Sequence, residues 1–402
     1  MAKNDIEPRS VSVAAPYELP AGWKWIALLD AFENKTSSQK KVPTNEYLKH
    51  GQYAIIDQGQ EFIGGYTNDE SKVFKDNLPV IIFGDHTRNI KFIDFPFAQG
   101  ADGIKVLKPK DFLDAIFFYY GLKNIVFPDL GYRRHFPLFK NFYFPLPPTL
   151  AEQQRIVSRI ESLFAKLDEA KDKAQSVVDG SELRRAAILH KAFTGELTAK
   201  WRKEHGVSDD SWEEKTIGDC LFPMTTKMPS GETFRYIDIE SIDNRTQTVK
   251  NPKIIAVSEA PSRASRELKE NDVLFSMVRP YLKNIAVIDK SLCDCIASTG
   301  FYVCRCNGML NYRYLYNLLC SKDAIDYLMQ FMKGDNSPSI RKNDLLEMSI
   351  NLPTLAEQQE IVRILDSVLE KEADAKETAE YVLEQIDLLK KSILARAFRG
   401  EL

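Results

Sequence analysis

Apolar residues recur in alternating steps of four and three along two separate stretches of the chain. The first stretch places them at Ile156, Ile160, Leu163, Leu167, Ala170, Ala174 and Val177. The second places them at Ile361, Leu365, Val368, Ala375, Ala379, Val382, Ile386, Leu389 and Ile393, with Glu372 as the polar interruption. Steps of this kind put a narrow apolar stripe on a helix, and such a stripe needs a partner helix.

Two arrangements would cover these stripes. Each helix can pack on its own domain, or the two helices can pack on each other. A narrow stripe that continues for several heptads, in both stretches, favours pairing of the helices with each other. The small alanines within the stripes allow a close approach, which suits an antiparallel pair.

The two stretches belong to two copies of one passage. Residues 148–197 begin PTLAEQQRIV and end AFTGEL, while residues 353–402 begin PTLAEQQEIV and end AFRGEL. At a constant offset of 205 residues, 23 of the 50 positions are identical. A duplication this regular indicates two equivalent elements, each following a different domain. A partner that binds one copy can therefore bind the other.

Both copies begin with a helix-capping pattern. Thr149 precedes Glu152 by three residues, and Thr354 precedes Glu357 in the same way, so each threonine can cap a helix whose glutamate reaches back to it. The copies differ at Gly180, where the second copy has glutamine. Glycine is a poor helix former, so we expect the first helix to break or kink near residue 179 and to resume at residue 182.

The regions between the copies, roughly 15–146 and 208–352, share landmarks in the same order. Each mixes short β-rich runs with Gly, Asn and Asp turns and then has an aromatic, helix-like stretch. The shared landmarks are Trp25 and Trp212 near each start, VIIFGDHTRNIKFID (80–94) with VLFSMVRPYLKNIAVID (273–289), and FAQGADGIKVL (97–107) with CIASTGFYVCR (295–305). These pairs indicate two diverged α/β domains of one ancestry.

The chain therefore divides into four parts. We predict a first domain at 1–147, a first spacer helix at 148–197, a second domain at 198–352 and a second spacer helix at 353–402. The predicted fold class is α/β (α+β), with two similar domains separated by two long helices that form an antiparallel coiled coil. The repeat gives this arrangement a pseudo-two-fold symmetry.

Composition sets modest bounds on function. The 402 residues are 44% hydrophobic and 28% charged, which suits two globular domains. The N-terminal MAKNDIEPRS is not an apolar signal segment and no apolar run is long enough to cross a bilayer, so a cytoplasmic location is expected. The net charge of −3 comes from the second copy, where seven Lys and Arg face eleven Asp and Glu. The two domains are near neutral, which neither shows nor excludes a basic groove.

The cysteines and histidines do not favour a metal site. Two Cys-x-Cys pairs lie in LCDCIASTGFYVCRC, but structural zinc sites use a spacer of two residues or more. Reduced cysteines packed in the core are the favoured interpretation. The five histidines are scattered, without a spacing typical of metal ligands.

Catalysis by this chain is poorly supported. The sequence has no Asn-Pro-Pro-Tyr-type motif for a flipped adenine, no glycine-rich cofactor loop after a strand and no P-loop. A nuclease-like carboxylate pattern can be drawn from Glu267, Lys269 and the upstream Asp243. Because Glu-x-Lys is common by chance, we give that pattern little weight.

The order of these motifs resembles the specificity subunit of Type I restriction-modification systems. The sharpest marks are PTLAEQQ at 148–154 and 353–359, and GELTAKWR at 195–202, and the resemblance covers the whole chain. In that family the two variable regions are target recognition domains, each of which reads half of a split DNA site. The paired helices hold them apart and dock two modification (methyltransferase) subunits.

The resemblance implies a non-enzymatic subunit that binds double-stranded DNA at a bipartite, asymmetric site. It directs adenine methylation by the methyltransferase subunits, and restriction by motor-nuclease subunits. S-adenosylmethionine, ATP and Mg²⁺ then belong to those partners, and this chain needs no cofactor. The alternative is a coiled-coil scaffold that binds proteins without DNA specificity.

The spacing of the helix agrees with a split site. A helix from about residue 150 to 178 is roughly 43 Å long at about 1.5 Å per residue. Two half-sites one duplex turn apart are about 34 Å from centre to centre. A single chain with two different readers addresses an asymmetric site, whereas a homodimer addresses a palindrome.

Base reading needs polar side chains in loops beside strands, since paired donors match guanine and amides match adenine in the major groove. In the first domain the candidates are Lys35, Thr36, Gln58, Gln60, His86, Thr87, Arg88, Arg133 and Arg134. In the second domain they are Thr225, Lys227, Arg235, Arg263, Arg266, Arg279, Tyr281, Lys283, Ser339, Arg341 and Lys342. Some of these must bind phosphate, which positions the protein without specifying sequence.

Partner docking is expected at positions that the two copies share outside the apolar stripe. The candidates are Gln153, Gln154, Phe193, Gln358, Gln359 and Phe398. The two phenylalanines also fit a second interpretation, in which they belong to the core at each helix end.

Overall fold

The computed structural model describes residues 17–101 and 103–402. The chain forms two compact units, one of residues up to Gln175 with Glu380–Leu402, the other of Ser176–Ala379. Each unit holds one α/β domain and a part of each long helix, α2 (Leu150–Phe193) and α7 (Leu355–Phe398), both 44 residues long. Among the described residues, no helix is long and apolar enough to cross a membrane.

The first domain is built from short strands and one helix, α1 (Ala115–Asn124). Its strands are β1 (Lys24–Ala27), β2 (Phe32–Asn34), β3 (Tyr53–Ile56), β4 (Gly65–Thr67), β5 (Val73–Phe74), β6 (Val80–Gly84), β7 (Ile90–Ile93), β8 (Phe97–Gln99), β9 (Ile104–Pro109) and β10 (Tyr143–Leu146). They form a four-stranded sheet of order β2-β9-β6-β7, a second of order β4-β3-β8-β5, and the pair β1-β10. Only the β3–β8 pairing among these is parallel.

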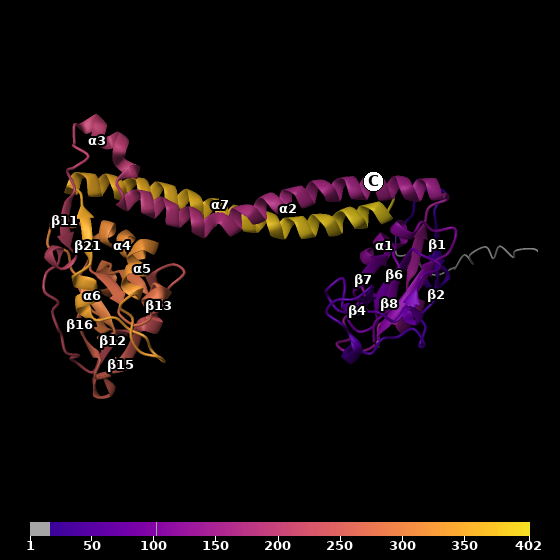
Figure 1. Cartoon of the computed structure of the whole chain (residues 1–402), viewed down its shortest axis with the longest axis horizontal. Helices are drawn as coiled ribbons and strands as arrows, with labels where there is room; N and C mark the ends of the chain where they lie inside the picture. The colour runs from indigo at the N-terminus through magenta and orange to yellow at the C-terminus, as the bar shows by residue number, and fades with distance from the viewer. Residues whose placement is uncertain (1–16, 102) are drawn as a thin grey trace, which may run out of the picture. The chain divides into compact units, whose positions relative to one another are not determined.

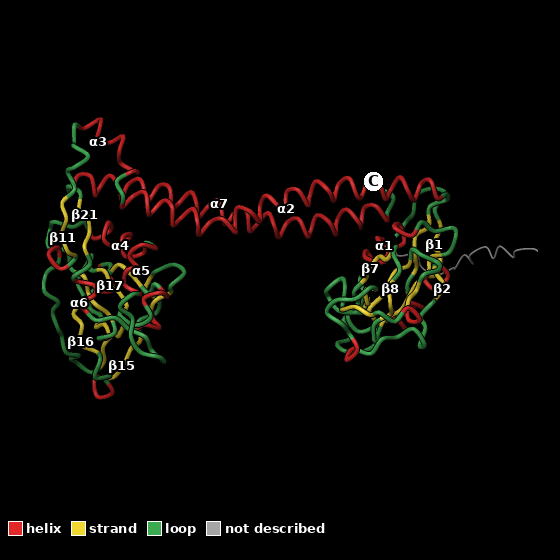
Figure 2. The backbone as a smooth tube through the Cα atoms, in the orientation of Figure 1, coloured by secondary structure: helices red, strands yellow, loops and turns green. Residues whose placement is uncertain are grey.

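The second domain has more helical content. Its strands are β11 (Glu213–Thr216), β12 (Thr233–Ile237), β13 (Ile242–Asp243), β14 (Thr248–Val249), β15 (Lys253–Ala256), β16 (Ala264–Glu267), β17 (Val273–Ser276), β18 (Ile285–Val287), β19 (Ile296–Ser298), β20 (Phe301–Cys304) and β21 (Ser349–Leu352). Its helices are α3 (Ala199–His205), α4 (Tyr312–Cys320), α5 (Lys322–Met329) and α6 (Lys342–Leu346). Figure 2 shows the strands of each domain, with β1 and β21 reaching the long helices.

The two domains share one strand order, which agrees with the common ancestry predicted from the landmarks. The sheet β18-β17-β20 repeats β7-β6-β9, and β15-β12-β19-β16 repeats β4-β3-β8-β5. In both, the pairing at the centre of the second sheet is parallel, β3 with β8 and β12 with β19. The pair β11-β21 repeats β1-β10. Lys24 pairs with Leu146 and Glu213 pairs with Leu352, at the same end of each strand pair. The residue before each is a tryptophan, so the counterpart of Trp212 is Trp23 and not Trp25, which the landmarks suggested.

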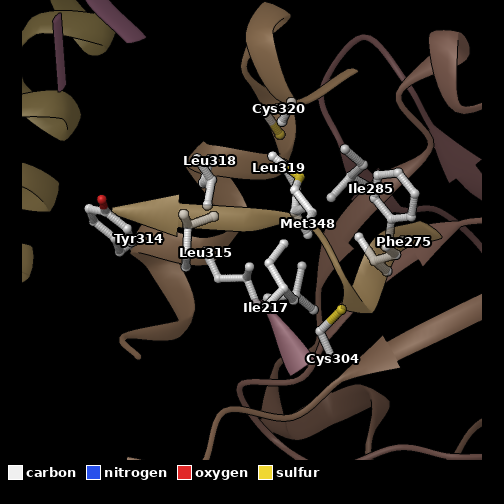
Figure 3. Close-up of a cluster of buried hydrophobic side chains, with 14 of the residues drawn as sticks. Ile217, Phe275, Ile285, Cys304, Tyr314, Leu315, Leu318, Leu319, Cys320 and Met348 are labelled. Atoms are coloured by element: carbon white, nitrogen blue, oxygen red, sulfur yellow. The ribbon is translucent and has the colours of Figure 1, made fainter. Parts of the chain in front are cut away.

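The core of each domain includes the ends of the long helices. In the first unit, Ile156 and Ile160 of α2 and Phe398 of α7 are buried with Phe117 and Phe144. In the second unit, Leu189 of α2 and Ile361 and Leu365 of α7 join the cluster around Tyr314 and Leu315. Figure 3 shows part of that cluster, in which Leu315 and Leu319 of α4 gather with Phe275 and Ile285 of the sheet. The start of each apolar stripe therefore packs on a domain.

Within each unit the two helices run antiparallel, as predicted. In the first unit Arg155 donates to the Leu402 carbonyl at 2.8 Å, and Lys390 pairs with Asp168. In the second unit Arg184 pairs with Glu372 at 2.7 Å. Residue numbers rise along α2 while their partners on α7 fall. Both predicted arrangements of the stripes thus hold, each over its own part of the helix.

The expected break at Gly180 is wrong, because α2 is one continuous helix through this residue. A Cβ at Gly180 would lie 2.5 Å from Arg184 Nη1, so the glycine leaves room for that guanidinium. Arg184 donates to the Val177 carbonyl at 2.8 Å and to Glu372 at 2.7 Å. Gly180 of α2 and Glu372, the polar interruption of the second stripe, therefore both accommodate the same Arg184 side chain.

The two motifs of the repeat meet at a buried carboxylate in the second unit. Glu357 is fully buried and accepts hydrogen bonds from Thr198 Oγ1 and Arg202 Nη1, both at 2.7 Å, and from Trp212 Nε1 at 3.1 Å. Burying a charge is costly unless it is paired and hydrogen-bonded. The P-T-L-A-E-Q start of α7 therefore depends on the G-E-L-T-A-K-W-R junction.

Candidate nucleic-acid interface

Each domain carries a hairpin loop at the same place in its sheet. Residues 85–89 join β6 to β7, and residues 277–284 join β17 to β18. The amide of Gly84 donates to the Asn89 carbonyl at 2.8 Å, and that of Ser276 donates to the Asn284 carbonyl at 3.1 Å. The residues before these asparagines, Arg88 and Lys283, are therefore equivalent. Both adopt a positive φ, 62° and 51°.

A second loop packs against each hairpin loop; we call residues 126–135 and 333–340 the return loops. The His135 amide donates to the Asp85 carbonyl at 2.7 Å, and the Ile340 amide donates to the Met277 carbonyl at 2.9 Å. Both domains thus hold two loops together by one equivalent backbone bond. Neighbouring loops with polar side chains on a sheet scaffold are a usual arrangement for binding residues.

In the first domain, side chains hold the loop pair together. The His86 ring stacks on the Tyr132 ring with centroids 4.6 Å apart, and Arg88 pairs with Asp129 at 3.0 Å. His135 is fully buried, with Nδ1 at 3.0 Å from the Asp85 carbonyl oxygen and Nε2 accepting from the Leu130 amide. That pattern fits a neutral ring whose Nδ1 carries the proton. His135 therefore positions the return loop from inside.

The first-domain candidates separate into exposed and structural side chains. Gln60, Arg133 and Arg134 are exposed, with no hydrogen bond or ion pair from their side chains to other described residues. Thr87 donates to the Gln58 carbonyl at 2.6 Å, and Gln58 Oε1 accepts from the His86 amide at 3.2 Å. Gln58, Thr87, His86 and Arg88 therefore lie together at the hairpin loop, beside the return loop that carries the two free arginines.

Lys35 and Thr36 lie apart from this loop pair. Thr36 Oγ1 donates to Asn34 Oδ1 at 2.6 Å and accepts from the Val106 amide at 2.9 Å. Lys35 pairs with Glu33 at 2.5 Å, and that hydrogen bond lowers the pKa of the glutamate. Thr36 thus completes the β2–β9 edge, which gives it a structural role.

The second-domain candidates fall into two clusters. Arg279, Tyr281, Lys283 and Ser339 lie on the hairpin loop and its return loop, and Arg341 and Lys342 follow at the start of α6. Arg279 has a φ of 49° and donates its side chain to the Asn336 carbonyl at 2.8 Å and its amide to the Pro338 carbonyl at 2.8 Å. Tyr281 is 42% exposed. This cluster matches the loop pair of the first domain.

The second cluster lies around the edge strand β16, with Thr225, Lys227, Arg263 and Arg266. Thr225 donates to Glu267 and accepts from Arg305, so its hydroxyl is occupied. Burial lowers the pKa of Arg266, whose Nε has no partner among the described residues. Arg235 on β12 pairs with Asp294 at 2.7 Å. Lys227 and Arg263 are the freely exposed members.

Sequence reasoning missed several residues at the first-domain loops. Tyr132 is 82% exposed on the return loop. The run GYRRH could have indicated this residue in the sequence, because a glycine beside polar residues is typical of a turn, and Gly131 does adopt a φ of 63°. Lys91 and Lys123 line a cleft of about 480 Å³ beside the hairpin loop. Burial lowers the pKa of Lys91, whose ammonium donates to the Asp57 carbonyl at 2.9 Å. These lysines lie on a strand and a helix, whereas base-reading residues were expected in loops.

The docking prediction needs correction at the buried positions. Gln153 accepts from the Asp114 amide at 2.8 Å, and Gln358 accepts from the Asn311 amide at 2.7 Å; both side chains are buried. Each glutamine thereby bridges a long helix to the first turn of α1 or α4. Phe398 is buried against Phe117, and Phe193 packs on Tyr314. Gln153, Gln358 and Phe398 are buried and Phe193 is half-buried, so all four help to hold helix and domain together. Gln154 and Gln359 are exposed, and docking of a partner there stays a prediction.

Sequence comparisons place this architecture among known proteins. The specificity subunit of the EcoDI Type I restriction enzyme of Escherichia coli is 22% identical over 290 residues, covering 63% of this chain and 61% of that protein. The EcoR124I/EcoR124II specificity subunit of the same species is 24% identical over 376 residues, covering 85% and 86%. The chain spans about 60% of the length of the first of these relatives.

A solved structure has a similar fold. The HsdS subunit from Thermoanaerobacter tengcongensis matches with a TM-score of 0.64 at 20% identity, covering 96% of this chain and 99% of that one. The pattern of the Type I restriction modification DNA specificity domain matches residues 20–177 and 209–385. Each matched segment contains one domain with its hairpin and return loops. The chain therefore belongs to the family of Type I restriction modification DNA specificity domains.

Proposed function

We propose that this chain is the DNA sequence-recognition subunit of a Type I restriction-modification complex and is non-catalytic by itself. The observation that carries the proposal is the pair of equivalent loop sites. Both domains present a hairpin loop bonded to a return loop at the same place in the same strand order, but with different side chains. Two related domains that present different side chains at equivalent loops suit a DNA site with two different halves.

Base contacts are assigned to exposed side chains on or beside the loop pairs. Arg133 and Arg134 in the first domain and Arg279 and Arg341 in the second carry paired donors, which match the acceptors of guanine in the major groove. Gln60 has the amide that suits adenine. Side chains already held by a carboxylate, such as Arg88 with Asp129, are better placed to bind phosphate or to shape the loop.

The partners follow from the repeat. Two copies of the same helix offer two equivalent surfaces, with Gln154 and Gln359 exposed at matching positions, and this suits two methyltransferase subunits. Those subunits would supply S-adenosylmethionine, and motor-nuclease subunits would supply ATP and Mg²⁺ chemistry. The sequence of this chain carries no motif for either reaction.

The test is to express the full chain with its methyltransferase partner in a host that lacks Type I methylation and to map methylated adenines by long-read sequencing. The expected result is one bipartite motif, methylated on both strands, that is absent when the chain is omitted. Methylation without sequence preference, or the same motif without the chain, would contradict the proposal.

A further inference from the structure

Beside the second domain, a basic cleft of about 470 Å³ reaches the long helices. Arg185 of α2 and Lys376 of α7 line it from the helix side, and Arg245 and Lys283 line it from the domain side. Glu182 is the one carboxylate among its lining residues. The cleft therefore holds four cations against one anion.

The cations of this cleft are not neutralised by the protein. Within the part of the chain that the structure describes, the side chains of Arg185, Arg245 and Lys376 make no hydrogen bond or ion pair. Arg184, the neighbour of Arg185 on α2, pairs with Glu372 instead. Unpaired like charges repel one another, and an external anion between them would relieve that repulsion.

The cleft continues into the hairpin loop of the second domain. Lys283 belongs to that loop and donates to the Cys320 carbonyl at 3.1 Å, which fixes its ammonium at the cleft. Asn244 lines both this cleft and its neighbour, which is lined by Arg279, Asn284 and Ser337 and also by the carboxylates Glu240 and Asp243. Those carboxylates are paired with Lys253 and Lys250. The two clefts adjoin at Asn244, so a ligand at the loop site lies next to the basic cleft on the helices.

The first unit repeats this arrangement with different residues. Lys123 of α1 and Lys391 and Arg399, at the end of α7, line a cleft of about 400 Å³. Lys123 and Val126 also line the cleft at the first hairpin loop. Arg399 lies over the Tyr17 ring at 5.6 Å, and the side chain of Lys391 has no hydrogen bond or ion pair among described residues. Each domain thus has a basic path from its hairpin loop to a long helix.

The chemistry of the cleft beside the second domain favours nucleic-acid phosphate over an acidic protein. Protein interfaces centre on apolar and aromatic side chains, whereas the helix-side walls beside the second domain are Arg185, Lys376 and Glu182. Duplex DNA carries a phosphate charge about every 1.7 Å along its axis, so it presents anions continuously from the loop site outward.

We propose that the long helices bind DNA backbone phosphates directly, through Arg185 and Lys376 beside the second domain and through Lys391, with Arg399 just after α7, beside the first. This inference rests on the proposed function of the chain as a DNA reader. In addition to the base contacts of the loops, the spacer helices would contact phosphates independently of sequence. Such contacts strengthen binding without changing the bases read.

The test measures the salt dependence of binding to a mixed-sequence duplex, using the full chain. Fluorescence anisotropy over a series of KCl concentrations gives the slope of log K against log salt. Each lost phosphate contact reduces the size of this slope by about 0.9, so R185A/K376A should reduce it by about 1.8. K391A/R399A should do the same. The matched control is K371A, because Lys371 is exposed on α7 five residues before Lys376, about 140° around the helix.

The outcomes separate the two proposals. A wild-type chain that binds no duplex at any salt concentration would remove the proposed function and this inference together. Wild-type binding with slopes unchanged in both double variants would overturn the inference alone. Loss of methyltransferase assembly with an unchanged slope would also overturn it, and would assign the basic paths to an acidic protein surface. Retained methylation specificity with a reduced slope is the predicted result.

Discussion

The buried carboxylate at the start of α7 offers the sharpest test of how the repeat is built. We predict that E357Q destabilises the junction far more than E152Q, although the two glutamates occupy the same position in the two copies. Glu357 is fully buried beside Arg202, whose side chain is 8% exposed. Glu152 pairs at 2.9 Å with Arg155, whose side chain is 53% exposed.

The magnitudes follow from burial. Removing one partner of a buried ion pair costs about 3–5 kcal/mol, because the other charge stays buried. Arg202 keeps Asp209 at 3.0 Å after the substitution, so the lower end, about 3 kcal/mol, is expected. An exposed pair contributes at most about 1 kcal/mol, so E152Q should lie within that range.

Native-state hydrogen exchange measures both effects locally, without requiring the whole chain to unfold in one step. Peptides covering residues 199–216 report on the Glu357 contact, and peptides covering 150–160 report on Glu152. R202M/E357M is the second variant, since replacing a buried ion pair by apolar residues is often neutral or stabilising. Equal losses of protection in E357Q and E152Q, or a double variant as unstable as E357Q, would refute the reasoning.

Three further predictions concern the helix pair, the first return loop and the buried Cys304. Replacing the pair on α2 and α7 by R184L/E372L should raise the unfolding temperature, because leucines continue the apolar stripe where a half-buried ion pair now lies; a lower temperature by calorimetry would contradict this. R133A/R134A should weaken recognition of one half-site and leave the other intact, as read by methylation mapping; loss of both halves would point to a folding defect. Burial raises the pKa of the Cys304 thiol, so at pH 8 the group stays protonated and iodoacetamide should modify it only after denaturation; rapid labelling of the folded chain, seen by mass spectrometry, would disprove this.

The parts of the fold that repeat were predictable from the sequence. The heptad steps, the caps at Thr149 and Thr354 and the order of the landmarks depend on local periodicity and on comparison within one chain. The predicted domain boundaries at 147/148, 197/198 and 352/353 stay predictions. Gly180 shows where local reasoning fails, since its helix-breaking tendency gives way to a contact with Arg184 that only the folded pair of helices creates.

The candidate site was only partly predictable. The hairpin loops stood out because polar residues interrupt two apolar strands, but nothing local showed that residues 126–135 pack on the first of them. Residue type also failed to distinguish surface from core. Gln153 and Gln358 are polar and yet buried, because each satisfies a backbone amide at the start of a neighbouring helix. Such pairings depend on residues about 40 or more positions apart.

The central claim, that two related domains read two halves of one site, has a direct test. Residues 15–146 of the full chain are replaced by the corresponding region of a relative that has a different methylated motif. Long-read methylation mapping should then show a motif with one half changed and the other half retained. A motif in which both halves change, or neither does, would contradict the account.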